Sequence, residues 1–230
     1  MKIITNDKLI SRNKKISKYS IYAAMASLAL AFYFTWRNDT ASMLYSLIAL
    51  FIGLLIWQIS MHYTSRWGAK VCPYELVSSA LKGLDDKYTL YHYTTPVSHL
   101  LVSPSALWVI DPILAGGRIS YQNGKWKQKG GNLFFKFFAQ DTIGRPDSEI
   151  NFEIRELERA FIKYNVDIDR SIIKPLILFF NQQVELDLDK APVICLPSTK
   201  AKEYLRKQPK NNAIPSDLLQ RIRPVITVNE

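Results

Sequence analysis

The sequence predicts an α/β protein in which an N-terminal transmembrane helical hairpin precedes a domain with a mixed central sheet flanked by helices. Residues 20–36 and 41–63 contain no Asp, Glu, Lys or Arg, and the rest of the chain alternates helix-like and strand-like patterns. A chain of 230 residues suits one domain with an attachment, since domains usually contain roughly 100–200 residues. The expected organisation is a basic leader at 1–19, the hairpin at 20–63 and the domain at 70–230.

The two apolar stretches predict helices over about 20–36 and 43–62. A helix needs about 20 apolar residues to cross the hydrocarbon core, so the second is long enough and the first lies at the short end of the range. A cleaved signal peptide is the alternative for the first stretch. Its bulky end, Phe32–Trp36, lacks the small residues of a cleavage site and favours a retained helix. The short polar turn Arg37–Ser42 then predicts an antiparallel pair.

Small residues recur at four-residue spacing on both stretches: Ala23, Ser27 and Ala31 on the first, Ala49 and Gly53 on the second. Such spacing lets helix backbones approach closely in lipid. Chance occurrence in an Ala-rich segment is the alternative.

Basic residues set the expected orientation. The leader carries Asp7 as its acid against Lys2, Lys8, Arg12, Lys14, Lys15 and Lys18. In the connecting turn Arg37 is offset by Asp39, and Arg66 follows the second stretch. This bias places both flanks, and so both termini, on the cytoplasmic side of the cytoplasmic membrane. The lipid bilayer is therefore an expected partner, and anionic lipid accounts for part of the net charge of +10.

The cysteines give a further indication of compartment. Cys72 and Cys195 are the two in the chain and provide no disulfide framework. This fits a reducing environment.

The first half of the domain reads as a helix followed by strands. Apolar residues at helical spacing predict a helix from Pro73 to about Gly83–Asp86. Apolar, Tyr-rich and Thr-rich runs then predict strands at Tyr88–Thr95, Val97–Val102 and Leu107–Ile110. Asn123-Gly124 predicts a type I′ hairpin between strands at Arg118–Tyr121 and Lys125–Lys129.

The second half contains the clearest helix. Glu149–Tyr164 carries an apolar stripe formed by Ile150, Ile154, Leu157, Phe161 and Tyr164. The continuous apolar run Leu176–Phe180 predicts a strand buried on both faces. Shorter elements complete the expected order: strands at Val184–Leu188 and Val193–Leu196, and helices at Thr199–Lys207 and from Ser216 to about Arg223.

A series of short motifs runs through the domain from about Pro73 to Arg206: Tyr74-Glu75-Leu76, Ser98-His99-Leu100-Leu101-Val102-Ser103-Pro104, Leu107-Trp108-Val109-Ile110-Asp111, Gly117-Arg118-Ile119, Gly124-Lys125-Trp126 and Pro175-Leu176-Ile177-Leu178-Phe179. Together they resemble the nuclease-related domain called NERD, a branch of the restriction-endonuclease-like (PD-(D/E)xK) fold. Nucleases of this fold hold a divalent metal on acidic side chains at strand ends, and the metal activates water.

The resemblance implies a degenerate site. The family's first acid falls on Ser98, its Glu-x-Lys falls on Asp111, Pro112 and Ile113, and its helical Glu matches Glu75. Ile113 cannot replace a cation, and Glu75 and Asp111 alone are too few ligands for a hard cation. No cofactor is therefore expected. Mg²⁺ or Mn²⁺ would be bound only if the site is rearranged, with Arg118 in place of the lysine of Glu-x-Lys. His99 is expected to be a packed strand residue.

Two surface features are candidates for contacts with partners. The basic strands carry Arg118, Lys125, Trp126, Lys127 and Lys129. A solvated hairpin face is the first expectation for these residues, and contact with nucleic acid or lipid is the alternative. The run Leu133–Phe138 contains Phe134, Phe135, Phe137 and Phe138. A core strand is the first expectation for this run, and contact with a partner or the membrane interface is the alternative.

The sequence therefore predicts a membrane-anchored, nuclease-related domain that serves as a binding module and does not cut. One alternative is a divalent-metal-dependent nuclease with a rearranged site. Another is an accessory subunit of a larger membrane protein complex.

Overall fold

The computed structural model describes residues 1–37, 39–68, 72–131 and 142–208, together with 214, 218–219, 221–222 and 225. It is a mixed α/β structure. Contacts divide the chain into two compact units. The helical unit is Asp7–Pro73, and the α/β unit combines Met1–Asn6 with Tyr74–Glu230.

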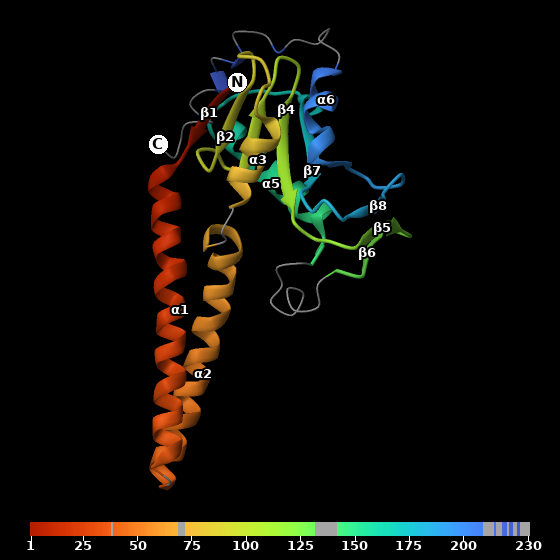
Figure 1. Ribbon diagram of the computed structural model, residues 1–230. Helices are drawn as coiled ribbons and strands as arrows, with labels where there is room; N and C mark the ends of the chain where they lie inside the picture. The colour runs from red at the N-terminus through yellow and green to blue at the C-terminus, as the bar shows by residue number, and fades with distance from the viewer. Residues whose placement is uncertain are drawn as a thin grey trace. The chain divides into compact units, whose positions relative to one another are not determined.

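The helical unit contains α1 (Asp7–Trp36), α2 (Thr40–Tyr63) and a π-helical turn, η1 (Thr64–Gly68). α1 and α2 run antiparallel and side by side (Figure 1), with hydroxyl groups of Ser17 and Thr64 2.9 Å apart at one end. α1 begins at Asp7, well before the expected start near residue 20. Lys and Arg are frequent in its first turns and are good helix formers, while Asp7 suits the positive end of the helix dipole.

Burial in the helical unit is inverted relative to a water-soluble protein. Large apolar side chains point outward, with Phe32 77%, Trp36 90% and Phe51 64% exposed. The buried side chains are mostly small or polar: Ile10, Asn13, Ser17, Ala24, Ser27, Ala31, Ser42, Gly53, Ser60 and Trp67. Within the described residues one helical stretch, which begins at Thr40 and contains α2, is long and apolar enough to cross a membrane.

The α/β unit is built on a six-stranded mixed sheet, as expected. Its strands in spatial order are β1 (Lys2–Thr5), β2 (Thr89–His92), β3 (His99–Val102), β4 (Leu107–Ile113), β7 (Ile173–Phe179) and β9 (Ile194–Pro197). β2, β3 and β4 are antiparallel neighbours, while β1 pairs with β2, β7 with β4, and β9 with β7 in parallel.

β1 is the main departure from the expected order, because residues 1–19 were predicted to be a leader. Lys2 pairs with Thr89 and Thr5 with His92. The Asn6 amide then donates to the His92 carbonyl at 3.0 Å. The chain therefore leaves the sheet at Asn6 and enters α1 at the next residue.

Helices cover both faces of the sheet (Figure 1). α3 (Pro73–Leu81) and α6 (Ala201–Arg206) pack on one face, against a cluster that includes Leu101 and Trp108. α5 (Pro146–Lys163) packs on the other through the predicted stripe of Ile150, Ile154, Leu157 and Phe161, while the predicted member Tyr164 follows the helix and is exposed. Short 3₁₀ turns, η2 (Arg170–Ile172) and η3 (Ser198–Lys200), precede β7 and α6.

A three-stranded sheet accompanies the large one, in the order β6 (Lys125–Lys129), β5 (Arg118–Gln122) and β8 (Glu185–Asp187). Asn123 and Gly124 join β5 to β6 with φ values of 52° and 72°. Two positive φ angles are the mark of a type I′ turn, so the predicted hairpin is confirmed.

Two predicted elements lie wholly or partly outside the described residues. The run Leu133–Phe138, with Phe134, Phe135, Phe137 and Phe138, is outside them entirely. The helix expected from Ser216 is described at 218–219, 221–222 and 225, which are helical.

Candidate functional site

Two of the three strand positions expected to match the nuclease pattern, Ser98 and Asp111, meet in one row across the large sheet. β3 and β4 pair antiparallel in a register that, continued past Leu100, places Ser98 opposite Asp111. β7 and β9 extend the row with Ile177 and Cys195. Ile177 belongs to the apolar cluster beneath α5, and side chains in a row share a face, so this row faces α5.

Ser98 is held by Glu153, a residue of α5. The Ser98 hydroxyl donates to Glu153 Oε1 at 2.6 Å, and the Ser98 amide donates to Oε2 at 3.4 Å. The position that matches the family's first acid is thus filled by a hydroxyl donor bound to a carboxylate from the helix above it.

Glu153 was not among the residues predicted for the site. Helical spacing alone could have placed Glu153 near the sheet, because it lies three residues after Ile150 and four before Leu157, at the margin of the buried stripe. Its contact with Ser98 depends on how α5 crosses the sheet. The sequence contains no information on that crossing that can be read locally.

Asp111 and Asp147 both lie close enough to Cys195, the β9 residue of this row, to act on its thiol. Burial, together with the charges of Asp111 and Asp147, raises the pKa of the Cys195 thiol to about 12. Cys195 is therefore protonated at neutral pH and is a poor nucleophile. Asp147 also accepts a hydrogen bond from the Trp126 indole at 2.8 Å, which ties the small sheet to the start of α5.

Ile113, the position expected to match the lysine of the nuclease pattern, has an apolar side chain in apolar surroundings. Ile113 is buried within the cluster beneath α5, and it pairs with Phe179 on β7. Arg118, the suggested replacement for the missing lysine, lies on the small sheet with its guanidinium 3.7 Å from Asp187. That pairing directs the Arg118 charge to β8 at the protein surface.

Glu75 and Asp111 come from opposite sides of the sheet. Glu75 lies on α3 and accepts a hydrogen bond from the Tyr74 hydroxyl at 2.8 Å. Asp111 belongs to the row that faces α5. Within the described residues, no group of three or more His, Cys, Asp or Glu side chains has the arrangement of a metal site.

A buried histidine pair lies on the α3 face. His92 Nδ1 and His99 Nδ1 are 2.8 Å apart, and the Ser78 hydroxyl is 2.8 Å from His92 Nε2. A contact between two ring nitrogens holds one proton, so one imidazole donates and the other accepts. Burial lowers the pKa of His92 to about 4, which keeps it neutral at physiological pH.

His99 is a packed strand residue, as expected, with its ring centroid 5.1 Å from that of Tyr93. The pairing with His92 was not expected. It arises because β2 and β3 place His92 opposite His99, and this register links residues on two strands.

The predicted basic surface is present on β6. Lys125, Lys127 and Lys129 alternate with half-buried residues and are exposed on one face of the strand. Trp126 faces the other way and is bound to Asp147, so it does not lie among the lysines.

Comparison of the chain with family models, with curated proteins and with solved structures found no match.

Proposed function

We propose that this chain is an integral membrane protein in which α1 and α2 form a transmembrane hairpin that anchors a cytoplasmic, NERD-like domain. The domain binds a partner and does not cut nucleic acid. The candidate partners are a membrane protein and a nucleic acid.

The inverted burial of the helical unit supports the membrane placement. Helices in lipid pack through small residues and side-chain hydrogen bonds, because lipid supplies no hydrophobic drive between them. Here the Ser27 hydroxyl donates to the Ala49 carbonyl at 2.6 Å, and Gly53 lies against the Ser27 side chain. The outward Leu, Ile and Phe side chains of α1 and α2 then face acyl chains.

The position of β1 supports two crossings. β1 precedes α1 and shares a sheet with β2, which follows α2. The segment before α1 and the segment after α2 therefore belong to one folded unit, and they lie in one compartment. If α2 crosses the membrane, α1 must cross in the opposite direction, and the Lys and Arg bias makes that compartment the cytoplasm.

The apolar surroundings of Ile113 are the main support for the proposal that the domain does not cleave nucleic acid. A nuclease of this fold needs a cation two residues after its second acid, and here that side chain is buried among apolar residues. Ser98 and Glu153 already satisfy each other where the first acid would bind metal.

A cleavage assay tests this part of the proposal. The purified full chain is incubated in neutral detergent with labelled single- and double-stranded DNA and RNA. Mg²⁺ or Mn²⁺ is added, and Asp111→Asn serves as the matched variant because it removes the charge and keeps the shape. The full chain is required, since a fragment from residue 70 lacks β1. We expect no cleavage from either protein.

Metal-dependent cleavage that disappears in Asp111→Asn would contradict the proposal and establish the rearranged nuclease. Cleavage that survives Asp111→Asn and co-purifies with the chain would also contradict the proposal, because it would place nuclease activity at other residues of the chain. Binding is measured in the same samples at two salt concentrations, because contacts to phosphates weaken as salt rises.

A further inference from the structure

The first turns of α1 extend the helix beyond the hydrocarbon core, if the helical unit spans the membrane as proposed above. The 30 residues of α1 measure about 45 Å at 1.5 Å per residue, against a core of about 30 Å. The uncharged stretch begins at Ser20. Tyr19 and Tyr22 are exposed next to this point, as expected of aromatic residues at an interface.

Two lysines fall within the headgroup layer on this geometry. That layer is roughly 5–8 Å thick on each side of the core. Lys18 and Lys15 precede Ser20 by about 3 and 7 Å along the helix axis. Lys8 lies about 18 Å from Ser20, beyond the layer.

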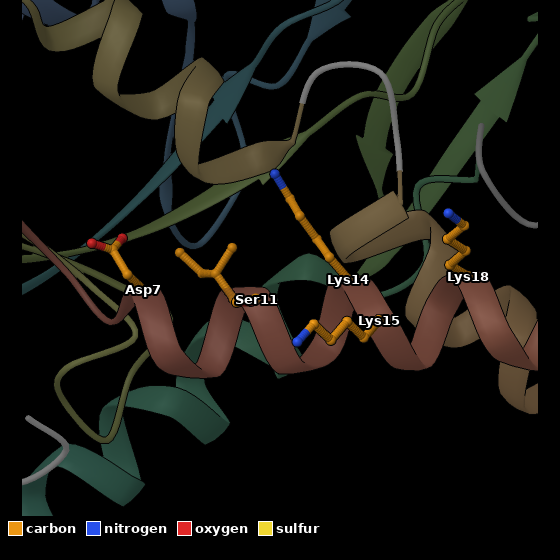
Figure 2. Close-up of a pocket in the computed structure, with 6 residues that line it drawn as sticks. Asp7, Ser11, Lys14, Lys15 and Lys18 are labelled. Carbon is orange, nitrogen blue, oxygen red and sulfur yellow. The ribbon is translucent and has the colours of Figure 1, made fainter.

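These lysines line a shallow hollow along one face of α1 (Figure 2). Its lining residues follow helical spacing: Asp7, Ile10, Ser11, Lys14, Lys15 and Lys18. Figure 2 shows Lys14 and Lys18 extending on the same side of the helix, with Lys15 lying across it toward Ser11. The acid of this face, Asp7, is at the end away from Lys18, so the half nearest Ser20 carries the three lysines and a positive charge.

We propose that this juxtamembrane basic face, formed by Lys15 and Lys18 with Lys14 beside them, binds the phosphate groups of anionic phospholipids. The inference rests on the proposed membrane placement and adds the lipid class and the residues that select it. Charge complementarity favours anionic over zwitterionic headgroups, and the lysine ammonium groups can donate charge-assisted hydrogen bonds to phosphate oxygens. Because a juxtamembrane lysine contributes about 1 kcal/mol and 1.4 kcal/mol is tenfold, loss of Lys15 and Lys18 should weaken binding about thirty-fold.

The test uses the full chain in neutral detergent, titrated with phosphatidylglycerol or phosphatidylcholine, with bound lipid counted by native mass spectrometry. K15Q/K18Q removes the two lysines, and K15R/K18R keeps their charge. K8Q/R12Q removes equal charge from the same helix farther from Ser20, and K125Q/K127Q removes it from β6. Excess inorganic phosphate is added in a separate arm.

We expect the preference for phosphatidylglycerol to fall about thirty-fold in K15Q/K18Q and to persist in the other three variants and in the phosphate arm. An unchanged preference in K15Q/K18Q, or an equal loss in K8Q/R12Q or K125Q/K127Q, would overturn the inference. Suppression by inorganic phosphate would also overturn it, because the face would then bind free anions. Extraction of the wild-type chain from membranes by alkaline carbonate would instead overturn the membrane placement, which separates the two failures.

Discussion

The helical unit and the α/β unit bury opposite kinds of side chain. In the α/β unit, Leu101 and Trp108 are fully buried on the face of the sheet that α3 and α6 cover, with other large apolar residues around them. In the helical unit, Leu54 is 52% exposed and Ser27 only 8%. The α/β unit therefore buries large apolar side chains, whereas the helical unit buries small and polar ones.

On the membrane placement proposed above, each unit is adapted to its own solvent. Water drives large apolar side chains into the interior of the α/β unit. In the helical unit, close approach and hydroxyl-to-carbonyl hydrogen bonds hold the helices together, as between Ser46 and the Ala31 carbonyl at 2.9 Å. The same substitution should therefore have different effects in the two units.

The largest contrast is expected for one leucine in each unit. Leu101→Ala should lower the free energy of opening of the α/β unit by about 2–5 kcal/mol, because it leaves a cavity in a packed core. Leu54→Ala should change the helical unit by less than about 0.5 kcal/mol, since its side chain contacts the surrounding solvent or lipid. Hydrogen exchange resolved by peptide, on the full chain in detergent, measures both. An equal loss for Leu54→Ala would contradict the inverted packing.

The second contrast is in pH dependence. The pKa of His92 is lowered by burial from 6.5 to about 4, so below pH 6.5 the unfolded chain binds a proton that the folded chain excludes. The contribution of His92 to the stability of the α/β unit should thus be constant above pH 6.5 and fall by about 3 kcal/mol as pH drops to 4. Hydrogen exchange across this range should show the loss in β2 and β3. In the control His92→Gln, which cannot titrate, an undiminished slope would assign the effect to other groups.

The third contrast uses two glycines. A Cβ at Gly53 would lie 3.3 Å from Ser27 Cβ and Oγ, so Gly53→Leu should separate α1 from α2 and cost about 1–3 kcal/mol. Gly124 has open space around it and a φ of 72°, so Gly124→Ala acts through backbone strain at the hairpin turn. Crosslinking between cysteines introduced on α1 and α2 measures helix separation. We expect it to fall in Gly53→Leu alone.

The smallest effect is expected for the hydroxyl of Ser27. Ser27→Ala removes its bond to the Ala49 carbonyl and should cost about 0.6 kcal/mol, the typical value for hydrogen bonds between helices in lipid. Ser11→Ala, on the exposed start of the same helix, is the control and should leave the pair unchanged. A loss well above 2 kcal/mol at Ser27 would show that polar contacts, more than close packing, hold the helices.

Local patterns predicted much of the fold. The stripe of α5, the Asn123-Gly124 turn and the apolar run of β7 each depend on neighbouring residues in the chain, and each is present. Pairing between distant segments was not predictable in this way. β1 is the clearest case, because its partner β2 lies beyond both long helices and its lysine resembles those of a basic leader.

The candidate site, too, was predictable only where it depends on local sequence. Ser98, Asp111 and Ile113 were identified from motifs, and the register of β3 and β4 brings Ser98 and Asp111 together. The bond from Ser98 to Glu153 depends on the packing of α5 on the sheet, and the histidine pair depends on the register of β2 and β3. Neither relation is encoded in sequence spacing.

The central claim is that α1 and α2 cross the membrane and return, so that β1 and the α/β unit share the cytoplasm. Single cysteines at Lys8, Arg37 and Lys125, in a chain with Cys72 and Cys195 replaced by serine, test it with a maleimide that cannot cross membranes. Intact cells should label the cysteine at position 37 alone, and permeabilised cells should label all three. Labelling of positions 8 and 125 from opposite sides of the membrane would contradict the account.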